Sequence, residues 1–285
     1  MLGYGTAPLG KEKITREHAM KCLNHAIDRG ITYLDTSPGY GSEPHIGEVM
    51  KDRRKEVFLA TKVDRRSKEG VLKEIQESLR KLQTDHVDLI QVHSVAAWAD
   101  LEQALAPDGA CAALEQAKKD GLVRFIGITG HARPAILGKA LEEYPFDTVL
   151  CALGMADRLI TSPETFLLPR ARERNVGVIA MKTLGHGHFP DASLALRYAL
   201  GLPGVSLAIV GMDRIEHIDQ NVEIAANFKP LSEDEMTELI TQVRPLVQED
   251  AQKNQEGGGK SDLFWLHDTA VTGWKEEDEP VLVSY

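Results

Sequence analysis

The chain has 285 residues, of which 42% are hydrophobic, so it is long enough to bury one large core. Its formal net charge of −10 argues against a concentrated basic face, and therefore against binding to nucleic acid or to an anionic membrane surface. No apolar stretch approaches the roughly 18 residues of a membrane span, and the first residues lack the basic start of a signal peptide, so we expect a cytoplasmic protein. The cysteines are widely spaced, which fits a reducing compartment and excludes a cysteine-ligated iron–sulfur module.

Apolar runs rich in Val and Ile alternate with segments of helical periodicity from one end of the chain to the other. Strands that are buried on both faces of a parallel sheet read as such continuous runs. The pattern therefore predicts an α/β protein with a parallel, eight-stranded (β/α)8 TIM barrel, an extra C-terminal helix and a tail. The predicted strands cover residues 1–6, 31–35, 57–62, 87–93, 123–128, 148–152, 176–181 and 207–210.

Capping residues mark the starts of several predicted helices. Thr15, Asp213 and Ser232 are predicted to cap the first, the last barrel and the C-terminal helix, and Pro134 opens another helix. The segment around Trp98 is predicted to be a loop. We expect the barrel domain to cover residues 1–256 and the tail to cover residues 257–285.

Polar residues lie where three successive predicted strands end. Asp35 ends the second strand, Lys62 the third and His93 the fourth, and Tyr40 lies in the loop that follows Asp35. Each residue taken singly has an ordinary structural explanation. If the strands are parallel neighbours, however, all four side chains meet at one rim of the barrel, which is where barrel enzymes place their active sites.

This constellation resembles the aldo-keto reductase family. The family's signature around its acid and tyrosine reads here Asp35-Thr-Ser-Pro-Gly-Tyr40-Gly-Ser-Glu43, followed by Gly47. The resemblance continues through residues 121–127, 177–182 and 228–233, so it covers about residues 1–247. It implies reduction of an aldehyde or ketone to an alcohol by hydride transfer from a nicotinamide cofactor. Relative to the family, the chain starts without the N-terminal hairpin that usually plugs the barrel.

The resemblance also implies a role for each rim residue. Tyr40 would be the proton donor, and Lys62 would supply the cation that makes a phenol of pKa about 10 a usable acid. Asp35 would neutralise and orient Lys62. His93 would hydrogen-bond the carbonyl oxygen of a small-molecule substrate and fix its angle.

The implied cofactor is NADPH, with NADH possible, and its contacts fall at the end of the first strand and at the ends of the later strands. The implied residues are Gly5, Thr6, Thr129, Met181, Leu184, Gly211, Arg214, His217, Gln220 and Asn221. Three positions depart from the family: Thr129-Gly130 replaces its usual Ser-Asn, Leu150 replaces its glutamine, and Met181 replaces its stacking aromatic residue. The nicotinamide ring must therefore be held differently.

The segment after strand eight bears on the choice between NADPH and NADH. His217 stands where the family often has an arginine that grips the 2′-phosphate, and Arg214 lies one turn earlier on the same helical face. We expect NADPH to be preferred, with a smaller margin than an arginine pair would give. The margin should widen below about pH 6.5 as His217 gains charge.

Other motifs have competing explanations. The glycines of residues 3–10 do not match a Rossmann phosphate loop, because the third glycine comes late and Pro8 interrupts the pattern. His186 and His188 have no third ligand at a suitable spacing, so no metal is expected. A cofactor-binding regulatory subunit with little turnover stays open as the alternative to an enzyme.

The tail and the substrate pocket are the least readable parts of the sequence. Residues 257–285 are either a disordered end or, as the resemblance implies, a flap over the substrate. Neither the physiological substrate nor the oligomeric state is indicated by a motif.

Overall fold

The computed structural model describes residues 1–131 and 133–255, and eight parallel strands lie at the centre of this part of the chain. The strands are hydrogen-bonded in sequence order, and the last also pairs with the first, so the sheet closes into a barrel. The predicted (β/α)8 barrel is confirmed. The strands are β1 (Leu2–Gly5), β2 (Tyr33–Asp35), β3 (Phe58–Val63), β4 (Val87–Val92), β5 (Val123–Gly130), β6 (Thr148–Ala152), β7 (Gly177–Met181) and β8 (Val205–Gly211).

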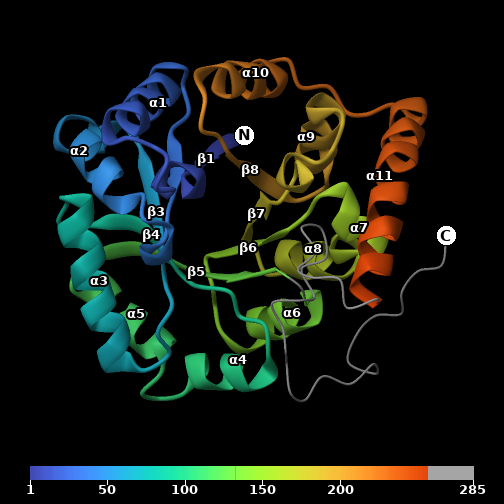
Figure 1. Cartoon of the computed structure of the whole chain (residues 1–285). Helices are drawn as coiled ribbons and strands as arrows, with labels where there is room; N and C mark the ends of the chain where they lie inside the picture. Colours follow the sequence, from blue (N-terminus) through green and yellow to red (C-terminus); the bar gives the residue numbers. More distant parts are fainter. Residues whose placement is uncertain (132, 256–285) are drawn as a thin grey trace.

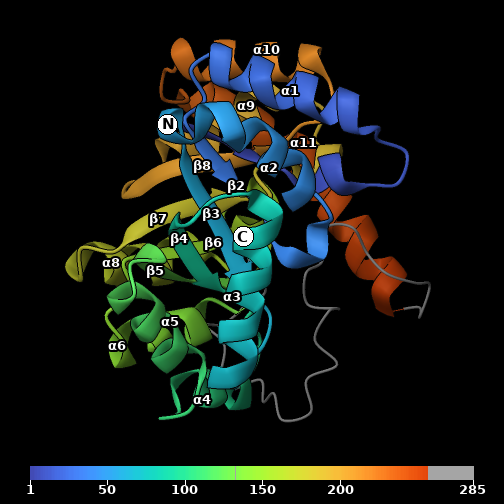
Figure 2. The ribbon, with the colours of Figure 1, turned by 90° about the vertical axis from the view of Figure 1, so that its left-hand side faces the viewer.

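Helices surround the strands (Figure 1), with α1, α2 and α3 on the side that faces the viewer in Figure 2. The α-helices are α1 (Arg16–Asp28), α2 (Glu43–Arg53), α3 (Lys68–Leu82), α4 (Trp98–Leu105), α5 (Ala110–Lys119), α6 (Pro134–Glu143), α7 (Met155–Ile160), α8 (Pro163–Glu173), α9 (Ala192–Gly201), α10 (Ile215–Ala226) and α11 (Glu233–Gln255). The short 3-10 helices are η1 (Ala7–Gly10), η2 (Pro38–Tyr40), η3 (Arg54–Glu56) and η4 (Gly185–Gly187). Helix α11 packs against α7 and α9.

Side chains of each strand alternate between the helices and the barrel interior. Outward residues such as Tyr4 and Leu34 are fully buried under the helices. The interior holds a second apolar cluster, made of Tyr33, Ala60, Leu89, Leu150, Ile179, Met181 and Leu207. Asp35 lies two residues after Tyr33, and Lys62 lies two residues after Ala60. Both therefore point inward from just above this cluster, toward the carboxyl ends of the strands.

Most of the helices begin at the residues that the predicted caps indicate. The Thr15 hydroxyl accepts from the His18 N–H at 3.2 Å, the Ser232 hydroxyl accepts from Glu235 at 3.2 Å, and Pro134 is the first residue of α6. The predicted Asp213 cap is wrong. Helix α10 begins one residue later than that cap requires, with Arg214 at the N-cap position and no side-chain cap.

Two short helices lie where the sequence pattern gave no helix. Helix α4 replaces the loop predicted around Trp98, and α7 follows β6. Both are too short for an apolar period to be read with confidence from a few residues. Helix α11 extends to Gln255. The predicted tail of residues 257–285 lies outside the described residues.

None of the helices that the structure describes is both long and apolar enough to cross a lipid bilayer.

Candidate active site

A buried ion pair lies at the centre of the barrel mouth. Asp35 and Lys62 are each only 1% exposed, and Lys62 Nζ donates to Asp35 Oδ1 at 2.5 Å and to the Thr36 carbonyl at 2.7 Å. A buried charge is costly unless it is paired and hydrogen-bonded. The two strand ends therefore supply each other's counter-ion.

Gln91 of β4 holds the second oxygen of the same carboxylate. Its side-chain Nε2 donates to Asp35 Oδ2 at 3.1 Å, and the residue is fully buried. Its Oε1 has no hydrogen-bond partner among the described residues. The sequence reasoning missed Gln91, although its position two residues before His93 places it on the same inward face of β4.

Tyr40 lies beside this pair, in the short helix η2. Lys62 Nζ is 4.8 Å from the centroid of the Tyr40 ring. The His93 ring is 5.9 Å from the same centroid and nearly perpendicular, at 79°. The structure therefore brings together the four residues that the sequence placed at successive strand ends.

Burial and the ion pair together set the protonation of this group. Burial raises the pKa of Tyr40, and although the charge of Lys62 lowers it, the pKa stays above its ordinary value. Burial alone would lower the pKa of Lys62, but the charges of Asp35 and Tyr40 and the hydrogen bonds to them together outweigh burial, so this pKa is raised. At neutral pH the phenol therefore keeps its proton and the ammonium keeps its charge.

His93 is oriented by an aspartate that follows β3. Its Nδ1 is 2.6 Å from Asp64 Oδ1, and its carbonyl accepts from Arg66 at 2.6 Å. The hydrogen bond from His93 lowers the pKa of Asp64. Because Asp64 accepts at Nδ1, Nε2 can donate to a substrate oxygen only when the ring carries both protons. The sequence reasoning also missed Asp64 and Arg66.

The residues expected near the nicotinamide and the diphosphate line the ends of β1, β5, β7 and β8. Gly5 pairs in register with Gly211 and with Asp35. The Thr6 hydroxyl donates to the Asp35 carbonyl at 2.8 Å, and Thr129 Oγ1 accepts from the backbone N–H of Ser94 at 2.7 Å. Both hydroxyls are thus committed to holding neighbouring strand ends. Met181 is the last residue of β7, and Leu184 follows it and packs on two apolar clusters.

The residues expected near the adenosine lie at the start of α10. Arg214, His217 and Gln220 are exposed, and His217 Nδ1 is 3.6 Å from Asp213 Oδ1. Asn221 is buried, and its Nδ2 donates to the carbonyl of His217 at 2.8 Å. The Oδ1 atom of Asn221 is buried without a partner in the described part of the chain.

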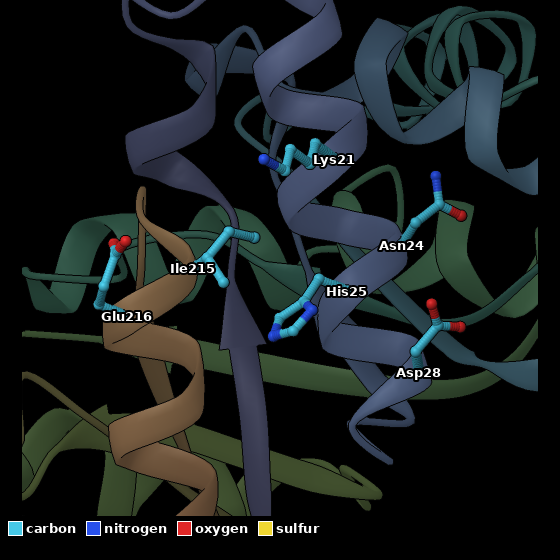
Figure 3. A pocket seen from close by; sticks show the side chains of 6 residues that line it. All are labelled: Lys21, Asn24, His25, Asp28, Ile215 and Glu216. Carbon is cyan, nitrogen blue, oxygen red and sulfur yellow. The ribbon is translucent and has the colours of Figure 1, made fainter.

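A cavity of about 420 Å³ lies between α1 and α10, outside the barrel. It is lined by Lys21, Asn24, His25, Asp28, Ile215 and Glu216. Figure 3 shows His25 and Ile215 in the space between the two helices. Of these residues, Ile215 and Glu216 directly follow Arg214, so the cavity borders the segment expected to hold the adenosine.

Among residues 1–131 and 133–255, no group of three or more His, Cys, Asp or Glu side chains is placed to hold a metal ion.

The comparison with protein families gives the decisive observation. The family model described as "Aldo/keto reductase family" matches residues 1–193 and 190–243 of the chain. The chain belongs to the aldo/keto reductase family.

Relatives of known name place this aldo/keto reductase among oxidoreductases. L-galactose dehydrogenase of Arabidopsis thaliana is 28% identical over 297 residues, which cover 87% of this chain and 90% of that protein. The holo form of aldo-keto reductase AKR11C1 from Bacillus halodurans is similar in structure, with a TM-score of 0.71, 25% identity, and coverage of 85% and 91% of the two chains. An aldo-keto reductase from Klebsiella pneumoniae in complex with NADPH gives a TM-score of 0.71 at 25% identity, over 84% and 89%. The predicted enzyme class, an oxidoreductase, is confirmed.

The family's pattern is changed in this aldo/keto reductase at positions that the structure explains in part. Where the family usually has Ser-Asn after strand five, the Thr129 hydroxyl is used to hold the backbone of Ser94. Where it has a glutamine, Leu150 belongs to the apolar cluster inside the barrel and is 1% exposed. Leu150 has no group that could donate to a nicotinamide carboxamide, whereas the Thr129 hydroxyl, which accepts from Ser94, still has its own proton to donate.

Proposed function

We propose that the protein reduces aldehydes or ketones to alcohols with NADPH, with Tyr40 as the proton donor. The observation that carries this proposal is the grouping of a buried Asp35–Lys62 pair with Tyr40 and His93 at the barrel mouth. A carbonyl oxygen in this group would find a protonated phenol on one side and an imidazole on the other.

Features of this chain fit the proposed cofactor. A Cβ on Gly211 would lie 2.9 Å from Pro8 Cγ, so a side chain does not fit there without a shift, whereas a Cβ on Gly5 would make an ordinary contact, 3.5 Å from the Gly211 nitrogen. Helix α10 begins nearby with uncapped N–H groups, which suit a phosphate. The buried Asn221 Oδ1, which has no hydrogen-bond partner within residues 1–131 and 133–255, can accept from an adenine amino group.

We assign the roles as follows. Bound NADPH would supply the hydride to the carbonyl carbon. The Tyr40 phenol donates its proton to the carbonyl oxygen, and Lys62 stabilises the phenolate that this transfer leaves. Asp35, held by Gln91, keeps Lys62 charged, and His93 orients the oxygen. Arg214 would hold the 2′-phosphate and thereby favour NADPH over NADH.

A cytoplasmic location belongs to the same proposal. It is supported by the free thiols of Cys22, Cys111 and Cys151, which are all buried. The alternative of a cofactor-binding regulatory subunit is not favoured, because the named relatives are oxidoreductases.

The test is NADPH consumption with a panel of aldehydes, for the wild-type protein and for Tyr40→Phe. We expect the variant to bind NADPH normally and to lose turnover by about 10²- to 10⁴-fold, the usual contribution of general acid catalysis. Tyr144→Phe, a tyrosine far from the mouth at the end of α6, is the matched control. If Tyr40→Phe keeps more than about a third of the wild-type activity, against the loss expected of an acid catalyst, the assignment is wrong.

A further inference from the structure

Two side chains, one from β1 and one from α1, hold the backbone of the segment that joins β8 to α10. The Tyr4 hydroxyl donates to the Met212 carbonyl at 2.7 Å, and His18 Nε2 lies 2.7 Å from the Asp213 carbonyl. A carbonyl oxygen only accepts, so Nε2 carries the ring proton of His18 and donates it. Two successive carbonyls of one short segment are therefore held from outside that segment.

Both donors belong to the packed layer between the strands and the outer helices. Tyr4 is fully buried, and burial raises the pKa of its phenol, so the hydroxyl keeps the proton that it donates. His18 is partly buried and lies one helical turn before the buried Cys22, whose Sγ is 3.5 Å from His18 Nε2. If the segment turned the Met212 carbonyl away, the buried Tyr4 hydroxyl would lose its acceptor, which is costly.

The same two contacts decide where the N–H groups of the segment point. The carbonyl of Met212 and the N–H of Asp213 belong to one peptide unit, and the carbonyl of Asp213 and the N–H of Arg214 belong to the next. None of the described peptide bonds is cis, and in a trans peptide the carbonyl and the N–H point in opposite directions. Each N–H is therefore aimed away from the side chain that holds its carbonyl. Neither N–H donates to an acceptor within residues 1–131 and 133–255.

Helix α10, which follows this segment, carries a second sign of a ligand. Asn221 is only 3% exposed, and its Oδ1 atom has no hydrogen-bond partner in the described part of the chain. A buried acceptor is ordinarily satisfied, so a partner that comes with a ligand would complete it. N–H groups at the start of a helix suit an anion. A nucleotide with a phosphate offers both, an amino group for Asn221 and oxygens for the N–H groups.

We propose that Tyr4 and His18 are positioning residues for the cofactor: by holding the carbonyls of Met212 and Asp213, they aim the N–H groups of Asp213 and Arg214 at a phosphate of NADPH. The inference rests on the proposed function. Neither side chain takes part in the hydride or proton transfer. Their contribution is preorganisation, because a segment that is already held does not have to be ordered when the cofactor binds. Loss of either hydrogen bond should therefore weaken cofactor binding and spare the chemical step.

The test compares variants of His18 with a variant of another histidine between the same two helices. His18→Leu removes the donor, and His18→Gln keeps an N–H donor at nearly the place of Nε2. The control is His25→Leu, because His25 Nε2 lies 2.9 Å from Asp219 Oδ1 and so joins α1 to a side chain of α10, not to the backbone of residues 211–214 (Figure 3). Tyr4→Phe, which removes only a hydroxyl, is a second, independent variant.

Dissociation constants of NADPH and of NADH are measured for the wild-type protein and all four variants, together with melting temperatures. Kinetics with an aldehyde of the panel add the KM for NADPH and the kcat at saturating NADPH. A general loosening of the fold would lower the melting temperature and would affect the His25 variant as well. Misdirected N–H groups would instead show in cofactor affinity alone, and the glutamine would restore it.

We expect His18→Leu to raise the dissociation constant and the KM of NADPH about tenfold, the cost of ordering roughly one backbone residue on binding. The kcat at saturating NADPH should not fall. Tyr4→Phe should weaken NADPH in the same direction, His18→Gln should restore most of the affinity, and His25→Leu should keep it. If NADH weakens equally, the N–H groups serve the diphosphate, and if NADH is unchanged, they serve the 2′-phosphate; either result supports the inference.

Unchanged affinity of His18→Leu and Tyr4→Phe for both cofactors overturns the inference. So does an equal loss of affinity in His25→Leu, or a His18→Gln protein that binds NADPH as weakly as His18→Leu. A wild-type protein that binds NADPH but reduces no aldehyde counts against the proposed function instead, and the dissociation constants still decide the inference.

Discussion

Tyr40 illustrates how the barrel, rather than the residue type, sets the chemistry of the site. The nearby cation of Lys62 lowers the pKa of the phenol, but burial raises it by more. A tyrosine with a raised pKa holds its proton throughout the neutral range. Such a residue is ready to donate a proton to a carbonyl oxygen, whereas the reverse reaction, which needs the phenolate, is favoured only at higher pH.

Lys62→Met tests this balance. Removing the cation takes away the group that lowers the Tyr40 pKa, so the alkaline limit of carbonyl reduction should move to higher pH while turnover falls by about 10²-fold or more. The measurement is the pH dependence of kcat for an aldehyde.

Loss of Lys62 also leaves the buried Asp35 without its counter-ion, which costs about 3–5 kcal/mol of stability when one partner of a buried pair is removed. The double variant Asp35→Asn/Lys62→Met is the control, because it removes the stranded charge. It should recover much of the melting temperature but not the turnover. An alkaline limit that stays in place or moves down would contradict the assigned role of Lys62.

We expect Arg214 to set the preference for the phosphorylated cofactor. It is exposed at the N-cap of α10, and the neighbouring His217 has Asp213 3.6 Å away as a competing partner. We expect Arg214→Ala to weaken NADPH about tenfold, the worth of one charge-assisted hydrogen bond, and to leave NADH unchanged.

The measurement is the dissociation constant of each cofactor at pH 6 and pH 8, with Arg80→Ala, an exposed arginine of α3, as the control. The ratio of NADPH affinity to NADH affinity should be larger at pH 6, where a histidine ordinarily gains charge. Asp213 partly neutralises a charged His217, so the increase should be modest. Equal affinity of the wild-type protein for NADH and NADPH at both pH values would refute the preference.

At the scale of single residues, the sequence pointed to the polar residues at the strand ends. It missed the side chains that hydrogen-bond to those residues. Asp35, Lys62 and His93 were visible because a polar residue ends an apolar run. Gln91 lies inside such a run and Asp64 lies just beyond one, so neither interrupts the pattern. Their roles depend on hydrogen bonds between different strands, such as the 3.1 Å bond from Gln91 to Asp35, and no spacing along the chain encodes these.

At the scale of elements, η1 supports the loop that carries Tyr40. A Cβ on Gly10 would overlap the carbonyl oxygen of Tyr40 and would lie 2.7 Å from the nitrogen of Ser42. Those atoms are backbone, so the loop itself would have to move. Gly10 has an ordinary backbone conformation, and an alanine there is therefore excluded by contact and not by φ.

We expect Gly10→Ala to lower kcat by about tenfold to a hundredfold, since misplacing a catalytic group by an ångström can cost that much. The control is Gly39→Ala in η2 itself, where the nearest atom to a new Cβ is Asp64 Oδ2 at 3.9 Å. Kinetics and thermal unfolding are measured for both. Similar kcat values for the two variants would show that η1 does not position Tyr40.

Element boundaries show where a single sequence stops being informative. Long helices such as α3 carry an apolar stripe of helical period in the sequence, and its Val71, Ile75, Leu79 and Leu82 are all buried. The short α4 and α7 were missed because one or two turns do not establish a period. The sequence predicted Asp213 as the N-cap of α10, but the N-cap in the structure is the following residue, Arg214. Tertiary contacts of Asp213 explain the difference. One of these contacts is the 2.7 Å hydrogen bond between the Asp213 carbonyl and His18 Nε2 of α1.

For the whole molecule, closure of the barrel explains why the described residues form a folded unit. Strand β8 pairs with β1, so no sheet edge is left open among the described residues. Helix α11 adds Leu239, Val243 and Val247 to the apolar cluster that covers α7 and α9. The buried clusters of the described chain are thus complete before residue 248.

The last prediction concerns residues 257–285, which carry Trp265 and Trp274 beyond a glycine-rich stretch. A shortened protein that ends at Glu256 keeps every strand of the barrel and every buried cluster described above. We therefore expect its melting temperature to stay within about 3 °C of the full chain, the shift that ~1 kcal/mol would give. The family resemblance implies a tail that acts as a substrate flap, so we expect KM to rise severalfold for at least one aldehyde while NADPH affinity is unchanged. Thermal unfolding and steady-state kinetics with the panel of aldehydes provide the measurement. A shortened protein that unfolds at room temperature, or that matches the full chain in KM for every substrate, would show that the tail is not such a flap.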